Sequence, residues 1–165
     1  MANNKAIEYE FVNDCERLKD LMNNTFDEFF WEDLLSQDDS IQNALSEGHE
    51  FILFTQEKKP CALVNMGGPF FGDEDSKEIY QLDVEDNNFG RGEGVGGKVV
   101  ELLKTQIYPD KRLYGYSVSE SAKFWVKHAS KVDEDILQMF KDAHIEDGYE
   151  EDELYCCEGL MLFWL

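Results

Sequence analysis

The chain has 165 residues, a length that suits one domain with its own buried core. Hydrophobic residues make up 42% and aromatic residues 13%, which is not the composition of a disordered segment. The 36 acidic residues outnumber the 15 basic ones and give a net charge of −21. A surface this negative repels phosphate backbones and anionic membranes, so the sequence argues against nucleic acid and membranes as partners and favours cationic or amine-bearing ones.

The cysteines and histidines show no pattern of a disulfide framework or a metal site. No CxxC pair is present, and the histidines have no ligand spacing with the cysteines or with each other. We expect free thiols in a reducing cytoplasm and no metal. The first residues have neither the basic nor the apolar region of a signal peptide, and no window is apolar enough for a membrane span, so a cytoplasmic location is expected.

In chain order, the N-terminal half alternates short strands with amphipathic helices. Apolar spacing predicts a strand over 7–12, helices over 16–31 and 40–46, and a hairpin of strands 51–55 and 61–66. Gly67, Gly68 and Pro69 end this hairpin. An acidic loop over 70–77, with two phenylalanines expected to be exposed, follows it.

The C-terminal half continues the same alternation. The expected elements are strand 79–84, helix 95–107, strand 112–118, helix 120–129 with Ser119 as its N-cap, helix 133–143, and an apolar strand over 159–165 inside the sheet. The order β-α-α-β-β-β-α-β-α-(α)-β predicts one α/β (α+β) domain over residues 1–165. Its core is a single mixed sheet with helices on both faces.

Charge is segregated along the chain. Residues 91–131 hold eight basic and four acidic residues, a net charge of +4, whereas the rest of the chain has a net charge of −25. The one cationic stretch of an acidic protein therefore coincides with its glycine-rich loop and the elements after it. This coincidence favours a small polyanionic ligand at the loop.

The glycine-rich stretch 90–99 matches three phosphate-binding patterns, in each of which main-chain N–H groups converge on an anion at a helix N-terminus. Gly92-x-x-x-x-Gly97-Lys98 matches a P-loop except that Val99 stands where Ser or Thr must hold Mg²⁺. Gly92-x-Gly94-x-x-Gly97 matches the dinucleotide fingerprint. However, the next strand does not end in the acidic residue that this motif needs, and the loop does not follow the first strand.

The third pattern, Arg91-x-x-Gly94-x-Gly96, resembles the coenzyme-A loop of the GNAT (GCN5-related N-acetyltransferase) family. The preceding strand end Leu82-Asp83-Val84 and the helix after the loop fit that context. Downstream, Ser119-x-x-Ala122-x-Phe124-Trp125-x-Lys127 is similar to the family's second motif. The resemblance covers most of residues 5–131 and implies the family's splayed mixed sheet. An acidic helical insert is expected at about 132–154 before the last strand, where this sequence departs from the family.

The resemblance implies acetyl-CoA as co-substrate and assigns residues to it. The strand before the loop would offer the main chain of Val84 to the pantetheine arm or to the thioester carbonyl. Ser119 would lie beside the pantetheine, and Lys123 would reach the phosphates of the adenosine end. The diphosphate would lie on the loop, on Arg91, Gly92, Glu93, Gly94, Val95, Gly96 and Gly97.

The implied reaction is transfer of an acetyl group from a thioester to a primary amine, which requires a base for the ammonium proton and an acid for the departing thiolate. Asp83 and Glu85 flank the strand end, and either is a candidate base. Trp125 stands where the family usually places a tyrosine acid, so Tyr116 is the candidate substitute, with Tyr155 as a further option. The catalytic candidates are therefore Asp83, Glu85 and Tyr116.

The sequence leaves the acceptor and the oligomeric state, including a homodimer, open. The acidic surface favours a small-molecule amine or a basic peptide as acceptor. Two alternatives stay open: a coenzyme-A-binding module without turnover, for which Trp125 is the motive, and an acidic protein that mimics nucleic acid and engages a basic partner.

Overall fold

The computed structural model describes residues 6–85, 94–146 and 159–165. The chain divides into two compact units, one comprising residues 1–68 and 79–109 and the other residues 69–78 and 110–165. The single domain expected over residues 1–165 stays a prediction.

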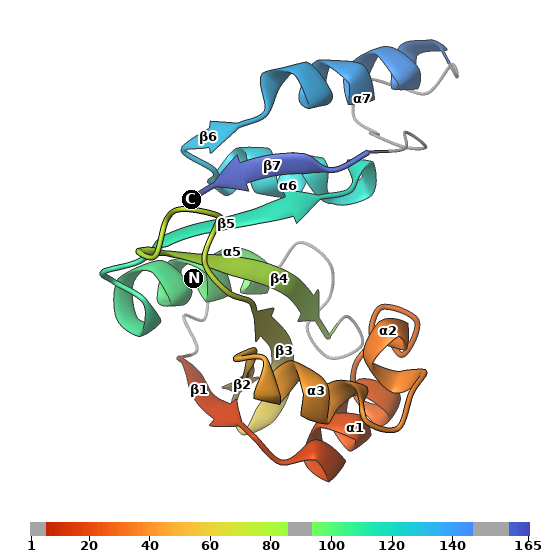
Figure 1. The fold of residues 1–165 in the computed structure, drawn as a ribbon, viewed down its shortest axis with the longest axis vertical. Helices are drawn as coiled ribbons and strands as arrows, with labels where there is room; N and C mark the ends of the chain where they lie inside the picture. The colour runs from red at the N-terminus through yellow and green to blue at the C-terminus, as the bar shows by residue number, and fades with distance from the viewer. Residues whose placement is uncertain (1–5, 86–93, 147–158) are drawn as a thin grey trace. The chain divides into compact units, whose positions relative to one another are not determined.

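The strands form a seven-stranded mixed sheet in the order β1-β2-β3-β4-β5-β7-β6 (Figure 1). Their bounds are β1 Ile7–Val12, β2 Glu50–Gln56, β3 Lys59–Met66, β4 Ser76–Val84, β5 Arg112–Ser117, β6 Lys131–Val132 and β7 Met161–Trp164. All neighbours are antiparallel except β4 and β5. The parallel ladder pairs Ser76–Glu78 with Arg112–Tyr114, and from Ile79 onward β4 pairs with β3. The predicted mixed-sheet fold is confirmed, including the position of the last strand between two others.

The helices lie close to their predicted positions. Their bounds are α1 Cys15–Asn24, α2 Glu32–Leu35, α3 Ser40–Ser46, α5 Val95–Leu102, α6 Ser119–His128 and α7 Glu134–Glu146, with a π-helical turn η1 at Leu103–Ile107. Asp14 caps α1 by accepting a hydrogen bond of 2.7 Å from the Arg17 N–H. Among the described residues, no helix combines the length and the apolar character that a membrane crossing requires.

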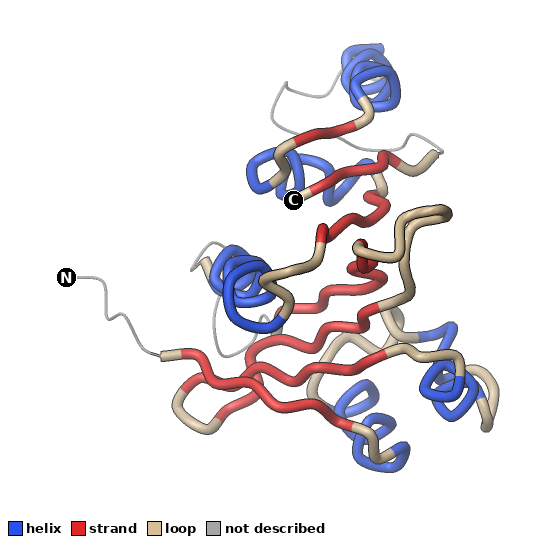
Figure 2. The backbone as a smooth tube through the Cα atoms, turned by 60° about the vertical axis from the view of Figure 1, so that its left-hand side comes forward, coloured by secondary structure: helices blue, strands red, loops and turns tan. Residues whose placement is uncertain are grey.

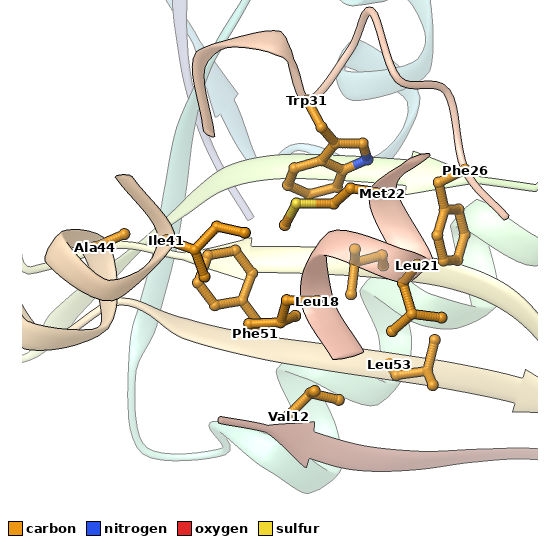
Figure 3. Close-up of a cluster of buried hydrophobic side chains, with 11 residues drawn as sticks. Val12, Leu18, Leu21, Met22, Phe26, Trp31, Ile41, Ala44, Phe51 and Leu53 are labelled. Atoms are coloured by element: carbon orange, nitrogen blue, oxygen red, sulfur yellow. The ribbon is translucent and has the colours of Figure 1, made fainter. Parts of the chain in front are cut away.

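The core of the first unit lies between its strands and the N-terminal helices. Phe51 and Leu53 of β2 point to the same side as Leu63 of β3, and α1 and α3 supply Leu18, Met22 and Ile41 to the same cluster (Figure 3). Burying each such side chain stabilises the fold by about 1.5–3 kcal/mol. This burial fixes the register of the strands, because a shift by one residue would turn the apolar set to the other face.

Both faces of these strands are covered (Figure 2). Four consecutive residues of β2, from Phe51 to Phe54, are buried, which requires packing on either side of the strand. On the face opposite α1 and α3, α5 packs against β3 with Val95, Val99 and Val100 buried. This packing sets where the N-terminus of α5 lies.

The prediction of one helix over 16–31 is wrong. Helix α1 ends at Asn24, where the Phe26 N–H bonds back to Leu21 O at 2.9 Å. In the turns that follow this helix end, the Asp27 side chain accepts a hydrogen bond from the Phe29 N–H at 3.1 Å, a local bond that an α-helix would not contain. The helical spacing of the aromatic residues therefore does not correspond to one continuous helix.

The second unit has an aromatic core. Trp125 of α6 stacks on Phe163 of β7 with ring centroids 4.2 Å apart, and Phe70 packs edge-on against Tyr114 at 5.2 Å. The expectation that both phenylalanines of the 70–77 loop are exposed is thus wrong for Phe70 and right for Phe71, which is 100% exposed. The expected Ser119 N-cap is also displaced. Val118 occupies the cap position, so Ser119 is the first residue of α6.

Candidate functional site

Helix α5 starts at a left-handed glycine. Gly94 has φ 78° and ψ 13°, and the Lys98 N–H bonds to its carbonyl oxygen at 3.0 Å. A Cβ at Gly94 would meet no heavy atom within 4 Å, so glycine is required here by its backbone conformation and not by lack of space. The sequence prediction that the helix after the loop begins at Val95 is confirmed.

The start of α5 has the features of an anion site. The N–H groups of Val95, Gly96 and Gly97 lie in the first turn, where they have no intrahelical acceptor. The half-buried Lys98 adds a positive charge to the same turn. The partial positive charge of a helix N-terminus favours an anion at this position. The other three residues assigned to the diphosphate, Arg91, Gly92 and Glu93, lie outside the described residues.

The last residues of β4 lie beside β3. Val84 pairs with Ala62 in the register, and the Glu85 N–H donates to Cys61 O at 3.0 Å, one residue beyond the ladder. Glu85 is only 4% exposed. A glutamate is rarely buried to this extent unless its carboxyl group is paired with another group.

Asp83 is held by the segment between α1 and α2. Its Oδ2 accepts hydrogen bonds from Trp31 Nε1 at 2.9 Å and from the Asp27 N–H at 3.1 Å. Asp83 points to the same face of β4 as Gln81, toward the N-terminal helices and opposite to Leu82 and Val84. The predicted orientation of Asp83 relative to Leu82 and Val84 is thus confirmed, but its indole partner was not foreseen.

A chain of polar side chains next to Asp83 runs from β4 across β3 to His49, the residue before β2. Gln81 Nε2 donates to Phe30 O at 3.1 Å, and Asn65 Nδ2 donates to Gln81 Oε1 at 3.2 Å. Asn65 Oδ1 then lies 2.8 Å from His49 Nδ1. Because an amide oxygen only accepts, the proton of this last bond belongs to His49 Nδ1. Sequence reasoning missed this network, whose members are far apart in the chain and follow no motif.

The other candidate residues belong to the second unit. Tyr116 on β5 is 45% exposed, with its ring 6.2 Å from that of Tyr114. Burial raises the pKa of Tyr114 to about 12, with the Glu78 carboxylate and Tyr116 adding to the effect, so Tyr114 is a poor proton donor. Ser119 is buried at the start of α6, and Lys123 is exposed one turn later. The structure therefore assigns Asp83, Val84, Glu85 and Gly94–Gly97 to one unit and Tyr116, Ser119 and Lys123 to the other.

Trp125 is a packing residue. Its ring is nearly parallel to that of Phe163, at an angle of 14°, and it is almost fully buried. The position where the resemblance expects a tyrosine acid is thus occupied by part of the aromatic core. Across residues 6–85, 94–146 and 159–165, no three His, Cys, Asp or Glu side chains gather as metal ligands would.

Comparison with known proteins gives similarity in structure but not in sequence. No protein-family model and no curated protein sequence matches the chain. An acetyltransferase from Thermus thermophilus superposes with a TM-score of 0.57 at 12% identity, over 98% of each chain. A GNAT family acetyltransferase from Elizabethkingia anophelis, solved with acetyl-CoA bound, superposes with a TM-score of 0.51 at 15% identity, over 99% of this chain and 98% of the other.

A Bacillus subtilis acetyltransferase, solved in complex with CoA, superposes with a TM-score of 0.55 at 11% identity, over 97% of this chain and 98% of the other. These matches extend over nearly the whole chain, beyond the motifs on which the resemblance was based. At such low identity a match of this kind establishes the fold. The chain has the fold of the GNAT acetyltransferases.

Proposed function

We propose that the protein is an N-acetyltransferase that moves an acetyl group from acetyl-CoA to a primary amine of a small molecule or basic peptide. The observation that carries this proposal is the start of α5, where left-handed Gly94 opens a helix whose first-turn N–H groups suit a diphosphate. The fold supports it, since structural neighbours of this chain were solved with acetyl-CoA or CoA.

The residues present fit coenzyme A. A Cβ built on Gly94 would meet no heavy atom within 4 Å, and the N–H groups of Val95, Gly96 and Gly97 have no acceptor within the helix, so both fit a bound anion, to which Lys98 adds charge. Arg91, Gly92 and Glu93 complete the cradle in this proposal. Val84 contributes its main chain to the pantetheine arm, and Ser119 and Lys123 contribute from α6.

Acetyl-CoA supplies the activated acyl group as a thioester. The amine nitrogen forms a bond to the acyl carbon, and the bond from that carbon to sulfur breaks. The chain's own groups manage the protons: Asp83 or Glu85 takes the proton that the ammonium must lose, and the Tyr116 hydroxyl protonates the thiolate. Between the two carboxylates, Glu85 is the more deeply buried, whereas Asp83 already accepts two hydrogen bonds on Oδ2.

One alternative function has an observation in its favour. Because Trp125 is part of the core and has no acidic proton, the protein would bind coenzyme A without turning it over if Tyr116 does not serve as the acid. Release of free thiol from acetyl-CoA in the presence of amines separates this alternative from the enzyme. An inactive binder releases none.

Calorimetric titration with CoA tests the proposed site. We expect the wild type to bind CoA and Gly94→Trp to bind at least about tenfold more weakly, because the substitution disturbs the left-handed turn and fills the open space. The matched control is Gly68→Trp, at another glycine whose Cβ position is open but whose backbone is not left-handed. Equal affinity in wild type and Gly94→Trp, or no affinity in either, contradicts the proposal.

Replacement of each candidate base assigns the proton acceptor. The true base, changed as Asp83→Asn or Glu85→Gln, should lower kcat by about 100-fold or more while CoA affinity is kept. Loss of the acidic limb from the pH profile of the variant identifies a base. A uniform loss at all pH values indicates a structural role instead.

A further inference from the structure

We propose that residues 27–33, called here the aromatic segment, recognise the acceptor, and that the acceptor is a primary amine joined to an aromatic body and lacking a carboxylate. The ligand is called an acceptor because this inference rests on the proposed acyl transfer. The binding surface itself is argued from contacts within the first unit alone.

The aromatic segment is tied to β4 at both ends. The Asp27 N–H and Trp31 Nε1 donate to Asp83 Oδ2 at 3.1 and 2.9 Å. Gln81 Nε2 donates to Phe30 O at 3.1 Å, and the fully buried Asn65 supports Gln81 from β3. These bonds attach the segment to Gln81 and Asp83, which lie on one face of β4. In the chain, both residues come just before Val84, where the proposed acyl site lies.

The side chains of Phe29 and Phe30, which lie between the anchoring residues Asp27 and Trp31, are exposed to solvent. Within the segment, the Trp31 side chain is fully buried. The Phe30 ring stands edge-on to the Trp31 ring, with centroids 5.4 Å apart and an angle of 81° between the ring planes. The Phe29 N–H is fixed by Asp27 Oδ1 at 3.1 Å. Despite this, Phe29 is 77% and Phe30 43% exposed. Two adjacent aromatic side chains kept in water on an anchored segment present a ready apolar surface to a ligand.

The surrounding charge selects the sign of the ligand. From Asp20 to Glu57 the chain has ten acidic residues and no lysine or arginine. Four of these carboxylates lie within the aromatic segment and are exposed: Asp27, Glu28, Glu32 and Asp33. Such a surface concentrates an ammonium group and repels a carboxylate.

Both features together define the ligand class. A ring face attracts an ammonium group that lies within about 6 Å of its centroid, and the ring also packs against a flat apolar body. An arylalkylamine satisfies the carboxylates and the rings at once. A polyamine offers charge but no apolar body, and an amino acid has a carboxylate that the acidic surface repels.

The test is direct binding followed by ligand-observed NMR, with 2-phenylethylamine, n-butylamine, spermidine and phenylalanine as probes. We expect 2-phenylethylamine to bind at least about tenfold more tightly than the other three. The double variant Phe29→Ser/Phe30→Ser should lose about tenfold in affinity for it. The matched control, Phe71→Ser, removes a phenylalanine that is also exposed but belongs to the other unit, and should leave the affinity unchanged.

Urea unfolding of the wild type, the double variant and Phe71→Ser shows whether the proteins are equally stable. With equal stability, a loss of affinity comes from the changed surface and not from unfolding. Tighter binding of spermidine or phenylalanine, or equal binding by wild type and the double variant, overturns the inference. Calorimetry with CoA keeps the two proposals apart. CoA binding with a failed amine result rejects only the recognition surface, whereas amine binding without CoA binding rejects the acyl transfer and leaves an amine-binding surface.

Discussion

Trp31 donates its indole N–H to Asp83 at 2.9 Å, and this bond joins the segment between α1 and α2 to the strand that ends at the candidate acyl site. The two residues are 52 positions apart in the chain. Trp31 is fully buried and belongs to the main core cluster of the first unit. A core residue therefore controls the position of a candidate catalytic carboxylate.

A double-mutant cycle of Trp31→Phe and Asp83→Ala measures this link. We expect a coupling of about 1 kcal/mol or more in the free energy of unfolding in urea, since hydrogen bonds to a charged group typically exceed neutral ones. Combining Trp31→Phe with Asp75→Ala, an exposed carboxylate of the other unit, should give additive effects. Additivity in the first cycle as well would show that the bond contributes nothing to stability.

Gly94 and Gly68 form a matched pair that separates backbone strain from steric conflict. Neither has a heavy atom within 4 Å of a built Cβ, but only Gly94 has a left-handed backbone. Gly94→Ala should therefore lower the free energy of unfolding by about 1–2 kcal/mol, whereas Gly68→Ala should change it little. Similar values for the two variants would mean that Gly94 does not hold its left-handed conformation in solution.

The two described cysteines should differ in reactivity. Cys61 is fully buried, and burial raises the pKa of its thiol to about 11, whereas Cys15 is half-buried. At pH 8 we expect iodoacetamide to alkylate Cys15 at least about tenfold faster than Cys61, because the thiolate is the reactive form. Peptide mass spectrometry over time follows both sites, and in urea their rates should converge. Faster alkylation of Cys61 in the native protein would contradict its burial.

Tyr114 is expected to make the free energy of unfolding fall at high pH. Burial raises its pKa in the folded state to about 12, above the ordinary value of about 10 that applies when the chain is unfolded. The neutral hydroxyl's contribution is therefore complete below pH 10 and is lost as the pH rises from about 10 to about 12. At pH 11 the expected loss is about 1 kcal/mol relative to pH 8.

Urea unfolding of wild type and Tyr114→Phe at both pH values isolates this contribution, since the phenylalanine variant cannot ionise there. The wild type should lose more stability between the two pH values than the variant. Tyr80→Phe, at an exposed tyrosine, is the control and should behave like the wild type. Parallel losses in wild type and Tyr114→Phe would refute the raised pKa.

Local patterns in the sequence were sufficient for most elements of the fold. The apolar runs of β2 and β3, the glycine pair after β3 and the helical spacing after Gly94 each depend on neighbours in the chain, and the structure confirms them. The helix predicted over 16–31 failed because apolar spacing alone does not distinguish a continuous helix from a helix followed by a turn. The helix closes at Asn24, where the Phe26 N–H bonds to Leu21 O, and the turn after it contains the bond from the Phe29 N–H to Asp27 Oδ1.

The burial of the aromatic side chains could not be predicted from local sequence either. Phe29, Phe30 and Trp31 are consecutive, yet Trp31 is fully buried while the other two are exposed. Likewise Phe70 packs on Tyr114 and its neighbour Phe71 does not. Hydrophobicity is nearly the same for all of them, so only the positions of the partner strands decide which ring enters a core.

By itself the sequence determined the order of most elements, the start of α5 after the glycine-rich loop and the separation of basic from acidic stretches, because each of these depends on residue type and short-range spacing. The tertiary structure alone decided that Asp83 meets Trp31, that Asn65 and Gln81 connect His49 to Phe30, and that Trp125 is a core residue. These contacts join residues far apart in the chain, and their geometry is set by the packing of helices on strands, which no local pattern encodes.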